Sequence, residues 1–300
     1  MGNHILEIKG VSKFYTGKTA LDKVTLTIPK SCIYGLLGPN GAGKTSLIRI
    51  INQITKADEG QVLFDGEILG PEHIRRIGYL PEERGLYKKV KVIDQLTYFA
   101  KLRGLNSREA LDKAHWWLKK MGLYEIRNKK IEEFSKGMQQ KIQFIVAVIN
   151  EPELLILDEP FSGFDPVNAE LLTDIILELK QKGVTILFST HRMESVEKLC
   201  DYMALIHQSK NILDGKVSDI KQRFRSDKFE LVSEKPIQFN QAGIELLSET
   251  VTDAGYPKYM VKLQNMSHND FLKQVMPQSE LLAFNVYMPS IHDIFIQSVS

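Results

Sequence analysis

The sequence predicts an α/β fold that carries a helical insertion and is followed by a small α+β domain. Short β-branched runs alternate with amphipathic helical stretches through about residue 220, which is the pattern of an α/β fold. The segment 154–157 is continuously apolar and 184–188 is apolar except for Thr185, as expected for central strands of a parallel sheet. From about Arg84 to Asn150 helical spacing replaces the strand pattern. We therefore expect one domain over residues 1–222, with the helical insertion at about 84–150.

Local signals predict individual elements of this first domain. The apolar segment Ile33–Leu37 indicates a buried strand that enters a glycine-rich turn. The segment 62–64 followed by Asp65 and Gly66 predicts a hairpin. Asp165 with Pro166 predicts the start of a helix, and Gly183 its end. The expected buried face of that helix consists of six apolar residues: Val167, Leu171, Leu172, Ile175, Ile176 and Leu179.

A second domain is expected over residues 223–300. The segments 229–232, 259–263 and 281–288 have strand patterns, whereas 269–276 and about 291–299 have helical spacing. About 75 residues lie near the lower limit for a domain with its own core.

Composition restricts the class of protein. Of 300 residues, 43% are hydrophobic and 25% are charged, which is typical of a globular chain and excludes disorder. The formal net charge is only +2, so no global field favours nucleic acid. No apolar run approaches the roughly 20 residues of a membrane-spanning helix, and the N-terminus lacks a secretory pattern. Cys32 and Cys200 lack metal-site spacing and are expected to be buried thiols, so we expect a soluble intracellular protein.

Charge is concentrated in the helical insertion. Residues 84–130 contain thirteen basic and four acidic side chains. A solvated helical face is the default interpretation, and contact with anionic lipid is the alternative. His115-Trp116-Trp117 could likewise mark an interface, although Trp117, Leu118 and Met121 at helical spacing favour a core.

A phosphate-binding loop follows the first buried strand. The segment that fits the pattern G-x-x-x-x-G-K-[ST] is Gly38-Pro39-Asn40-Gly41-Ala42-Gly43-Lys44-Thr45. Glycines let backbone N–H groups turn toward a phosphate, and the following helix directs its positive end at the same anion. Lys44 adds a point charge for the β- and γ-phosphates, and Thr45 offers a hydroxyl to Mg²⁺.

A pair of carboxylates ends the second apolar strand. Asp158 and Glu159 follow the segment 154–157, where buried charge is costly unless a cation or a polarised water compensates it. Asp158 is placed to hold Mg²⁺, and Glu159 to orient or deprotonate an attacking water.

Several ordered motifs resemble the ATP-binding subunits of ABC transporters. Ser135-Lys136-Gly137-Met138-Gln139-Gln140 is similar to the family's signature segment, and Ser162-Gly163-Phe164-Asp165 to its D-loop. His191 resembles the switch histidine, and Tyr15 the aromatic residue that stacks on adenine. The resemblance covers residues 5 to about 222 and implies a P-loop NTPase core with an antiparallel β subdomain. It also implies that Ser46 belongs to the ATP-binding loop, and that Lys44, Glu159 and His191 are catalytic.

The signature segment departs from the family pattern. The family usually has L-S-G-G-Q where this chain has Phe134-Ser135-Lys136-Gly137-Met138. The resemblance implies that Ser135, Lys136, Gly137 and Met138 contact ATP held by a partner subunit.

Glu82 stands where the family usually has a glutamine that contacts Mg²⁺, so the resemblance implies a metal role for it. The segments 79–87, 134–140 and 289–295 together resemble the sodium-exporter-like branch of bacterial ABC ATPases.

The implied function is an ATPase that powers a membrane transporter, with ATP and Mg²⁺ as cofactors. Two such subunits, identical or different, would form a dimer on polytopic permease subunits at the inner face of the cell membrane. Export is the favoured direction. An ABC ATPase that acts on ribosomes or nucleic acid is the alternative, and a solitary P-loop kinase is a third possibility that leaves the Ser135 segment unexplained.

Overall fold

Two compact units make up the chain in the computed structural model, which describes residues 3–83, 85–239 and 242–299. One unit ends at Val217 and the other spans Ser218–Ser298. The predicted boundary between residues 222 and 223 falls inside helix α7 (Val217–Arg223) and stays a prediction. Arg84, the expected start of the helical insertion, lies outside the described residues.

The first unit is built on a six-stranded sheet in the order β10-β9-β3-β8-β7-β6. All neighbouring strands are parallel except β9 and β10. Their bounds are β3 (Ile33–Leu37), β6 (Ile77–Leu80), β7 (Leu154–Asp158), β8 (Thr185–Thr190), β9 (Tyr202–His207) and β10 (Lys210–Lys216). Every residue of β3, β7 and β8 is buried, which confirms the three predicted central strands. The short strand β6 escaped prediction because its four residues include a glycine.

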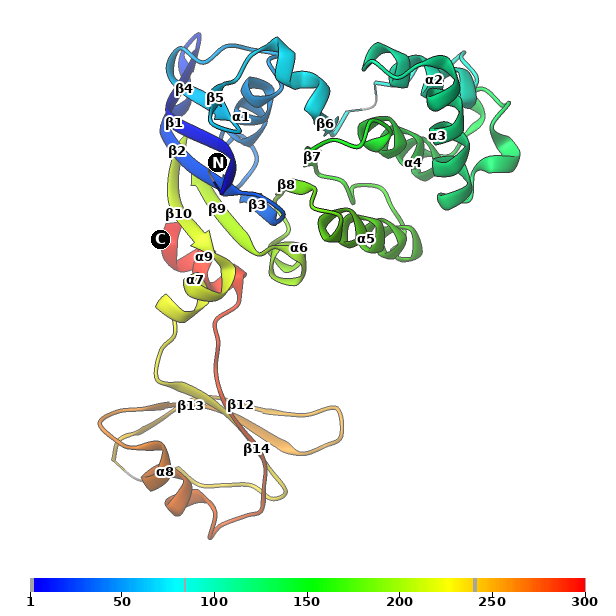
Figure 1. Cartoon of the computed structure of the whole chain (residues 1–300). Helices are drawn as coiled ribbons and strands as arrows, with labels where there is room; N and C mark the ends of the chain where they lie inside the picture. The colour runs from blue at the N-terminus through cyan, green and yellow to red at the C-terminus, as the bar shows by residue number, and fades with distance from the viewer. Residues whose placement is uncertain (1–2, 84, 240–241, 300) are drawn as a thin grey trace. The chain divides into compact units, whose positions relative to one another are not determined.

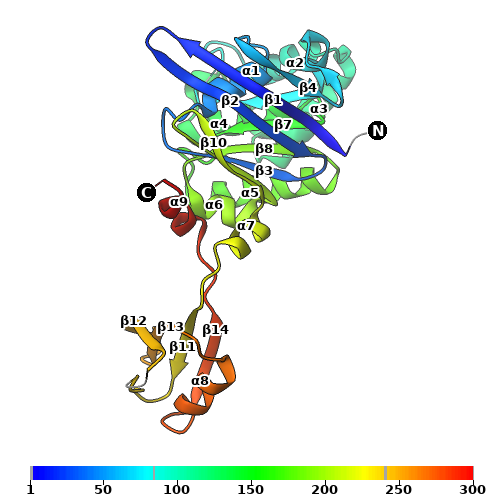
Figure 2. The same cartoon turned by 90° about the vertical axis from the view of Figure 1, so that its left-hand side faces the viewer.

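A second sheet in the same unit is antiparallel, in the order β2-β1-β4-β5. It contains β1 (His4–Tyr15), β2 (Lys18–Pro29), β4 (Glu59–Phe64) and β5 (Glu67–Ile68). The predicted hairpin is present, since Asp65 and Gly66 both have positive φ between β4 and β5. Helix α1 (Lys44–Ile51) contributes Leu47, Ile48 and Ile51 to a core shared with strands of both sheets (Figures 1 and 2).

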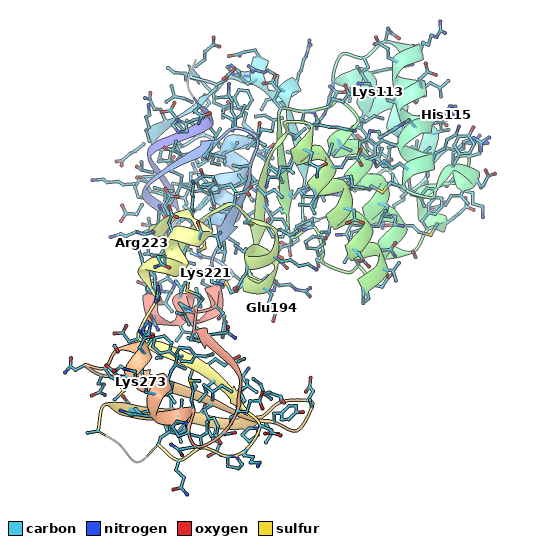
Figure 3. The ribbon with its side chains drawn as sticks, turned by 60° about the horizontal axis from the view of Figure 1, so that its bottom comes forward. Lys113, His115, Glu194, Lys221, Arg223 and Lys273 are labelled. Carbon is cyan, nitrogen blue, oxygen red and sulfur yellow. The ribbon has the colours of Figure 1, made fainter. Side chains whose placement is uncertain are left out.

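The predicted insertion is helical. It contains α2 (Val92–Leu102), α3 (Ser107–Lys120) and α4 (Lys136–Val148), which lie together beside β6 and β7 (Figure 1). On α3, Trp117 is buried, as are Leu118 and the following Met121, which confirms the core interpretation for these residues. Trp116 is half exposed, and Lys113 and His115 extend from the same helix (Figure 3).

Helix α5 (Pro166–Gln181) begins and ends where predicted. Asp165 Oδ1 accepts a hydrogen bond from the Asn168 N–H at 2.9 Å, and Gly183 has φ 91° just after the helix. Leu172, Ile175, Ile176 and Leu179 are buried. The prediction for Val167 is wrong, because this side chain is 76% exposed. It lies in the first turn, before the part of the helix that is buried. Helix α6 (Met193–Leu199) follows β8.

The second unit contains a four-stranded antiparallel sheet in the order β12-β13-β11-β14. Its elements are β11 (Lys228–Ser233), β12 (Ile244–Val251), β13 (Pro257–Leu263), α8 (His268–Val275), β14 (Leu281–Val286) and α9 (Ile291–Val299). Side chains of β11, β13 and α8 form its core, including Phe229, Tyr259 and Phe271. Strand β12 escaped prediction because nearly all its side chains are exposed, so its sequence carries no buried face.

Both thiols are free, as expected. Cys32 is buried directly before β3, and Cys200 is partly buried after α6. Burial raises the pKa of Cys32 to about 12, so this thiol stays protonated. Among the described residues, no helix is both long enough and apolar enough to cross a bilayer.

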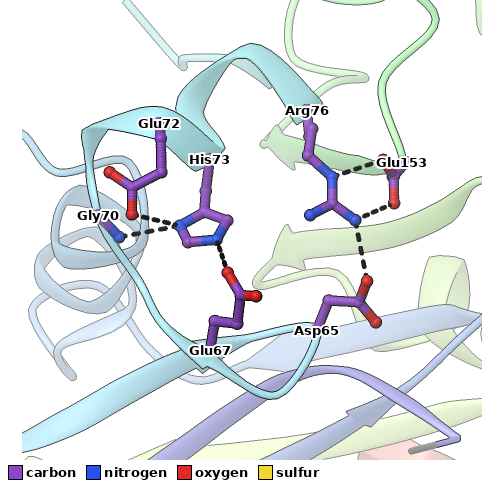
Figure 4. Close-up of polar contacts among 7 residues, drawn as sticks. All are labelled: Asp65, Glu67, Gly70, Glu72, His73, Arg76 and Glu153. Carbon is purple, nitrogen blue, oxygen red and sulfur yellow. Dashed lines mark hydrogen bonds and ion pairs between the residues drawn. The ribbon is translucent and has the colours of Figure 1, made fainter. Parts of the chain in front are cut away.

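A polar network joins the two sheets of the first unit (Figure 4). The Arg76 guanidinium donates to both carboxylate oxygens of Glu153, from Nε at 2.5 Å and Nη2 at 2.6 Å, and Nη2 also donates to Asp65 at 2.9 Å. Asp65 lies in the β4–β5 turn, and Glu153 directly precedes β7. Nearby, the buried His73 accepts from the Gly70 N–H at Nδ1, so its Nε2–H points at Glu67. Arg76 therefore holds the antiparallel sheet at the entrance of β7.

Arg76→Ala should lower the free energy of unfolding by about 1 kcal/mol, since the network is partly exposed and solvent weakens it. Arg76→Lys should recover less than half of the loss, because an ammonium group cannot bond both oxygens of Glu153 in one plane. Urea denaturation of the full chain measures both effects. Equal stability of the lysine variant and the wild type would contradict the bidentate role.

Candidate active site

Three loops meet where the parallel strands β3, β7 and β8 end. The parallel pairing aligns Leu37 with Thr190, and Asp158 with Ser189. The residues that follow these strands therefore share one edge of the sheet, where ligands of such sheets bind. A cleft of about 200 Å³ lies there, and its lining is formed by Tyr15, Lys18, Ala20, Asn40, Gly41, Gly43, Lys44, Thr45, Ser46, Glu82, Asp158 and Glu159.

The phosphate loop runs from β3 into α1, which starts at Lys44 as predicted. Gly38 and Gly43 have φ of 151° and 119°, and a Cβ on either would lie within 2.3 Å of a backbone oxygen of Ile206 or Ala20. The neighbouring backbone therefore requires glycine at both positions, in addition to any requirement of a phosphate.

Lys44 is buried and charged beside this loop. Its Nζ donates to the Gly38 carbonyl at 2.6 Å and to the Pro39 carbonyl at 3.2 Å. Burial lowers the pKa of Lys44, and the carboxylates of Glu159, Asp158 and Glu82 oppose that shift. The ammonium group therefore lies among opposite charges, at the end of the loop that would hold phosphates.

Asp158 is only 4% exposed at the end of β7. Burial raises its pKa, and the charges of Glu82 and Glu159 add to the shift. Thr45, Asp158 and Glu82 all line the cleft and offer hard oxygen donors of the kind that Mg²⁺ prefers. The described residues form no cluster of three or more acidic, His or Cys side chains arranged to hold a metal. Mg²⁺ at nucleotides typically uses one or two carboxylates plus phosphate and water, so this donor set fits it.

Glu159 is held in place by the loop after β8. One carboxylate oxygen accepts from His191, from the backbone N–H at 2.9 Å and from Nδ1 at 2.7 Å. The other accepts from the Thr190 hydroxyl at 3.2 Å. Glu159 itself has a positive φ of 48°, a conformation that costs energy in a non-glycine residue and often occurs at functional sites. Because a carboxylate only accepts, Nδ1 of His191 carries the proton, and Nε2 is left for another contact.

Tyr15 ends β1 and is 45% exposed at the cleft, while the neighbouring Phe14 is 47% exposed, so neither is a core residue. Asp58 fixes this hairpin end by accepting from the Phe14 N–H at 2.6 Å and from the Lys13 Nζ at 2.9 Å. Lys13 Nζ lies 5.5 Å from the centre of the Tyr15 ring. No signal in the sequence marks Lys13 and Asp58 as residues of the site, because only the fold brings them together.

The Ser135 segment begins α4 and does not line the cleft in this chain. Ser135 Oγ caps the helix by accepting from the Met138 N–H at 3.3 Å, and Ser135 and Lys136 are exposed. Gly137 and Met138 follow in the first turn. The structure thus separates these four residues from the phosphate loop of the same chain.

Two glutamines of α4 connect this helix to the cleft. Gln143 donates to the carbonyls of Pro81 and Glu83, on either side of Glu82, at 3.4 and 3.0 Å. Gln140 donates to the carbonyl of Pro160 at 2.9 Å, directly after Glu159. In the sequence Gln140 stands out only as part of the signature segment, and Gln143 is not marked at all. No local signal marks either contact, because their partners are 20 and about 60 residues away.

Comparisons with known proteins agree with this geometry. A family model described as "ABC transporter" matches residues 21–162, and one described as "ATP-binding protein DrrA1-3-like, C-terminal domain" matches residues 215–299. The chain is 43% identical over 299 residues to the uncharacterized ABC transporter ATP-binding protein YhaQ of Bacillus subtilis (strain 168), covering 98% of each. It is 36% identical over 212 residues to the ABC transporter ATP-binding protein NatA of the same organism, covering 69% of this chain and 86% of NatA.

A solved structure titled "Structure of ATP binding subunit of ABC transporter" superposes with a TM-score of 0.69 at 33% identity, covering 73% of this chain and 93% of that chain. The similarity to that structure includes the P-loop NTPase fold predicted from the sequence. Since a relative with 43% identity spans almost the whole chain, the protein belongs to the ATP-binding, ATP-hydrolysing subunits of ABC transporters.

Proposed function

We propose that this subunit hydrolyses Mg²⁺-bound ATP as one half of a dimer and so drives export through separate permease subunits. The observation that carries the proposal is the Glu159 carboxylate, held by His191 and Thr190 at the mouth of a cleft that also contains Lys44. A fixed carboxylate beside a phosphate-binding loop can accept the proton of an attacking water.

The residues of the cleft divide the chemistry among them. Lys44 exchanges its carbonyl partners for the β- and γ-phosphates, and the loop N–H groups bind the same anion. Tyr15 stacks on the base, with Ser46 and Asn40 beside the phosphates. Glu159 takes the proton from water while His191 keeps its carboxylate oriented. Thr45, Asp158 and Glu82 would hold Mg²⁺, which when bound would neutralise the charge that develops on the phosphate oxygens.

The separation of the Ser135 segment from the cleft supports a composite site. Ser135, Lys136, Gly137 and Met138 lie at an exposed helix start, where the positive helix end suits an anion. In a head-to-tail dimer they would close over ATP on the partner's phosphate loop. The contacts of Gln140 and Gln143 would then transmit closure between α4 and the Glu82 and Glu159 loops.

Transport requires partners outside this chain. No described helix is both long and apolar enough to cross a bilayer. In this proposal the transported molecule passes through other, polytopic subunits. Such an arrangement would place the chain in the cytoplasm, on the inner face of the membrane. The relation to NatA and the DrrA1-3-like C-terminal match support the exporter branch. The alternative action on ribosomes or nucleic acid has no support among these relatives. Residues 223–300 would form an accessory domain of the subunit.

Glu159→Gln should keep ATP binding but reduce hydrolysis by about 10²- to 10⁴-fold, because an amide cannot accept the proton of water. Steady-state phosphate release and nucleotide affinity measure the two effects. The matched control is Glu170→Gln, which makes the same substitution at an exposed residue of α5. Near-normal turnover of the Glu159 variant would exclude this residue as the base.

Asp158→Asn should raise the melting temperature of the nucleotide-free chain by about 2–4 °C at pH 8, which is roughly 1 kcal/mol for a domain of this size. The raised pKa of Asp158 means that its charged form is disfavoured in the fold, so stability falls as pH rises through that pKa. The advantage of the amide should therefore shrink toward acidic pH, where the wild-type carboxyl is neutral. Mg²⁺-dependent stabilisation by ATP should be lost. A lower melting temperature of the variant at pH 8 would contradict this account.

Mixing Lys44→Ala chains with Ser135→Arg chains should restore activity that neither variant has alone. The heterodimer has one intact site and one doubly damaged site, so independent sites predict up to roughly a quarter of the wild-type rate in an equal mixture. ATPase assays and native mass spectrometry of the mixture provide the two readouts. Heterodimers that form without any recovered activity would argue against independently working composite sites.

A further inference from the structure

Two distant segments of the helical insertion run side by side and gather lysines. The Val92 N–H donates to the Lys129 carbonyl at 3.0 Å, and the Ile131 N–H donates to the Val90 carbonyl at 3.2 Å. These bonds place Lys91 directly opposite Lys130 in an antiparallel bridge. The lysine patch formed by the two segments consists of Lys88, Lys89, Lys91, Lys129 and Lys130.

This arrangement is unfavourable for the isolated protein. All five side chains are exposed, and within the described part of the chain none of them forms an ion pair. Like charges directly opposite each other on paired strands destabilise the pair. Asp94, Glu132 and Glu133 lie in the same segments, but together with Arg127 the patch keeps three more positive than negative charges. By contrast, Lys113 on α3 (Figure 3) is paired with Glu151 at 2.9 Å.

The patch is also not a helical face. Lys88, Lys89 and Lys91 precede α2, and Lys129 and Lys130 precede the short turn that leads to α4. The five lysines are solvent-exposed, as the default interpretation of this basic stretch expects, but they do not form a face of a helix.

Exposed aromatic and apolar side chains border the lysines. Tyr87, which directly precedes Lys88, is 54% exposed, and Tyr98 is 48% exposed. The centres of the two rings are 6.4 Å apart. Val90, between Lys89 and Lys91, is 36% exposed. Tyrosine and lysine together are typical of surfaces at the headgroup level of a membrane, where the ring is half apolar and the ammonium reaches phosphates.

We propose that the lysine patch binds the surface of an anionic lipid bilayer. Lysines are flexible point charges that suit a fluid layer of phosphates, whereas a structured phosphate or carboxylate partner is usually bound by the planar fork of arginine. The patch also combines two surface segments with aromatic neighbours, and the repulsion between the opposed Lys91 and Lys130 is relieved when anions surround them. The attraction adds to any contact with permease subunits.

Co-sedimentation with lipid vesicles tests the proposal on the purified full chain without nucleotide or permease, so its outcome is independent of the proposed ATPase chemistry. Vesicles with about one-third phosphatidylglycerol should bind the chain, and pure phosphatidylcholine vesicles should not. The triple variant K88Q/K91Q/K130Q should bind about 100-fold more weakly, since each lysine near such a surface contributes about fivefold. Raising the salt from about 0.1 M to about 1 M should abolish binding, as the Debye length falls from about 10 Å to about 3 Å.

The matched control is K210Q/K262Q/K273Q, which removes the same charge from surface lysines elsewhere, including Lys273 on α8 (Figure 3). It should bind like the wild type. Equal loss in both triple variants would show a mere net-charge effect and overturn the proposal. Unchanged vesicle binding of the K88Q/K91Q/K130Q variant would also overturn it, as would wild-type binding to RNA or to a permease loop in the absence of any vesicle binding.

Discussion

The parallel pairing of β7 and β8 with β3 is the constraint on which the site depends. These strands are buried along their whole length, so their pairing is specified by apolar packing and backbone hydrogen bonds. Parallel strands must all end at the same edge, and this brings the Lys44, Glu159 and His191 loops to one edge of the sheet. The candidate site residues therefore lie in or next to loops, while their positions are set by the three buried strands. The single charged side chain in these strands is Asp158, at the end of β7.

Two oppositely charged groups in the cleft, Lys44 and Asp158, are both buried. Burial lowers the pKa of Lys44 and raises that of Asp158, so each charged form is disfavoured relative to water. Their mutual attraction offsets part of this cost. Phosphates would add further partners for Lys44 and Mg²⁺ would add one for Asp158, so nucleotide binding would raise folding stability at the same residues.

The helical insertion is tied to the cleft through side chains on one helix. Gln143 and Gln140 of α4 hold the backbone on either side of Glu82 and just after Glu159. A movement of α4 would therefore shift both loops. The same insertion also carries the lysine patch and the exposed Tyr87 and Tyr98.

The sequence by itself determined the elements whose signals are local. Loop glycines, the Lys44 helix start, the Asp165 cap and the continuously apolar strands depend on near neighbours, and all were predicted in place. It also revealed Asp158, Glu159 and His191 as motif residues. Only the tertiary structure decided that His191 holds Glu159 across 32 residues, that Asp58 braces the hairpin of Tyr15, and that Lys91 faces Lys130. Such contacts depend on how distant segments pack. Strand β12 could not be predicted from the sequence either, because an exposed edge strand has no alternation of apolar and polar residues.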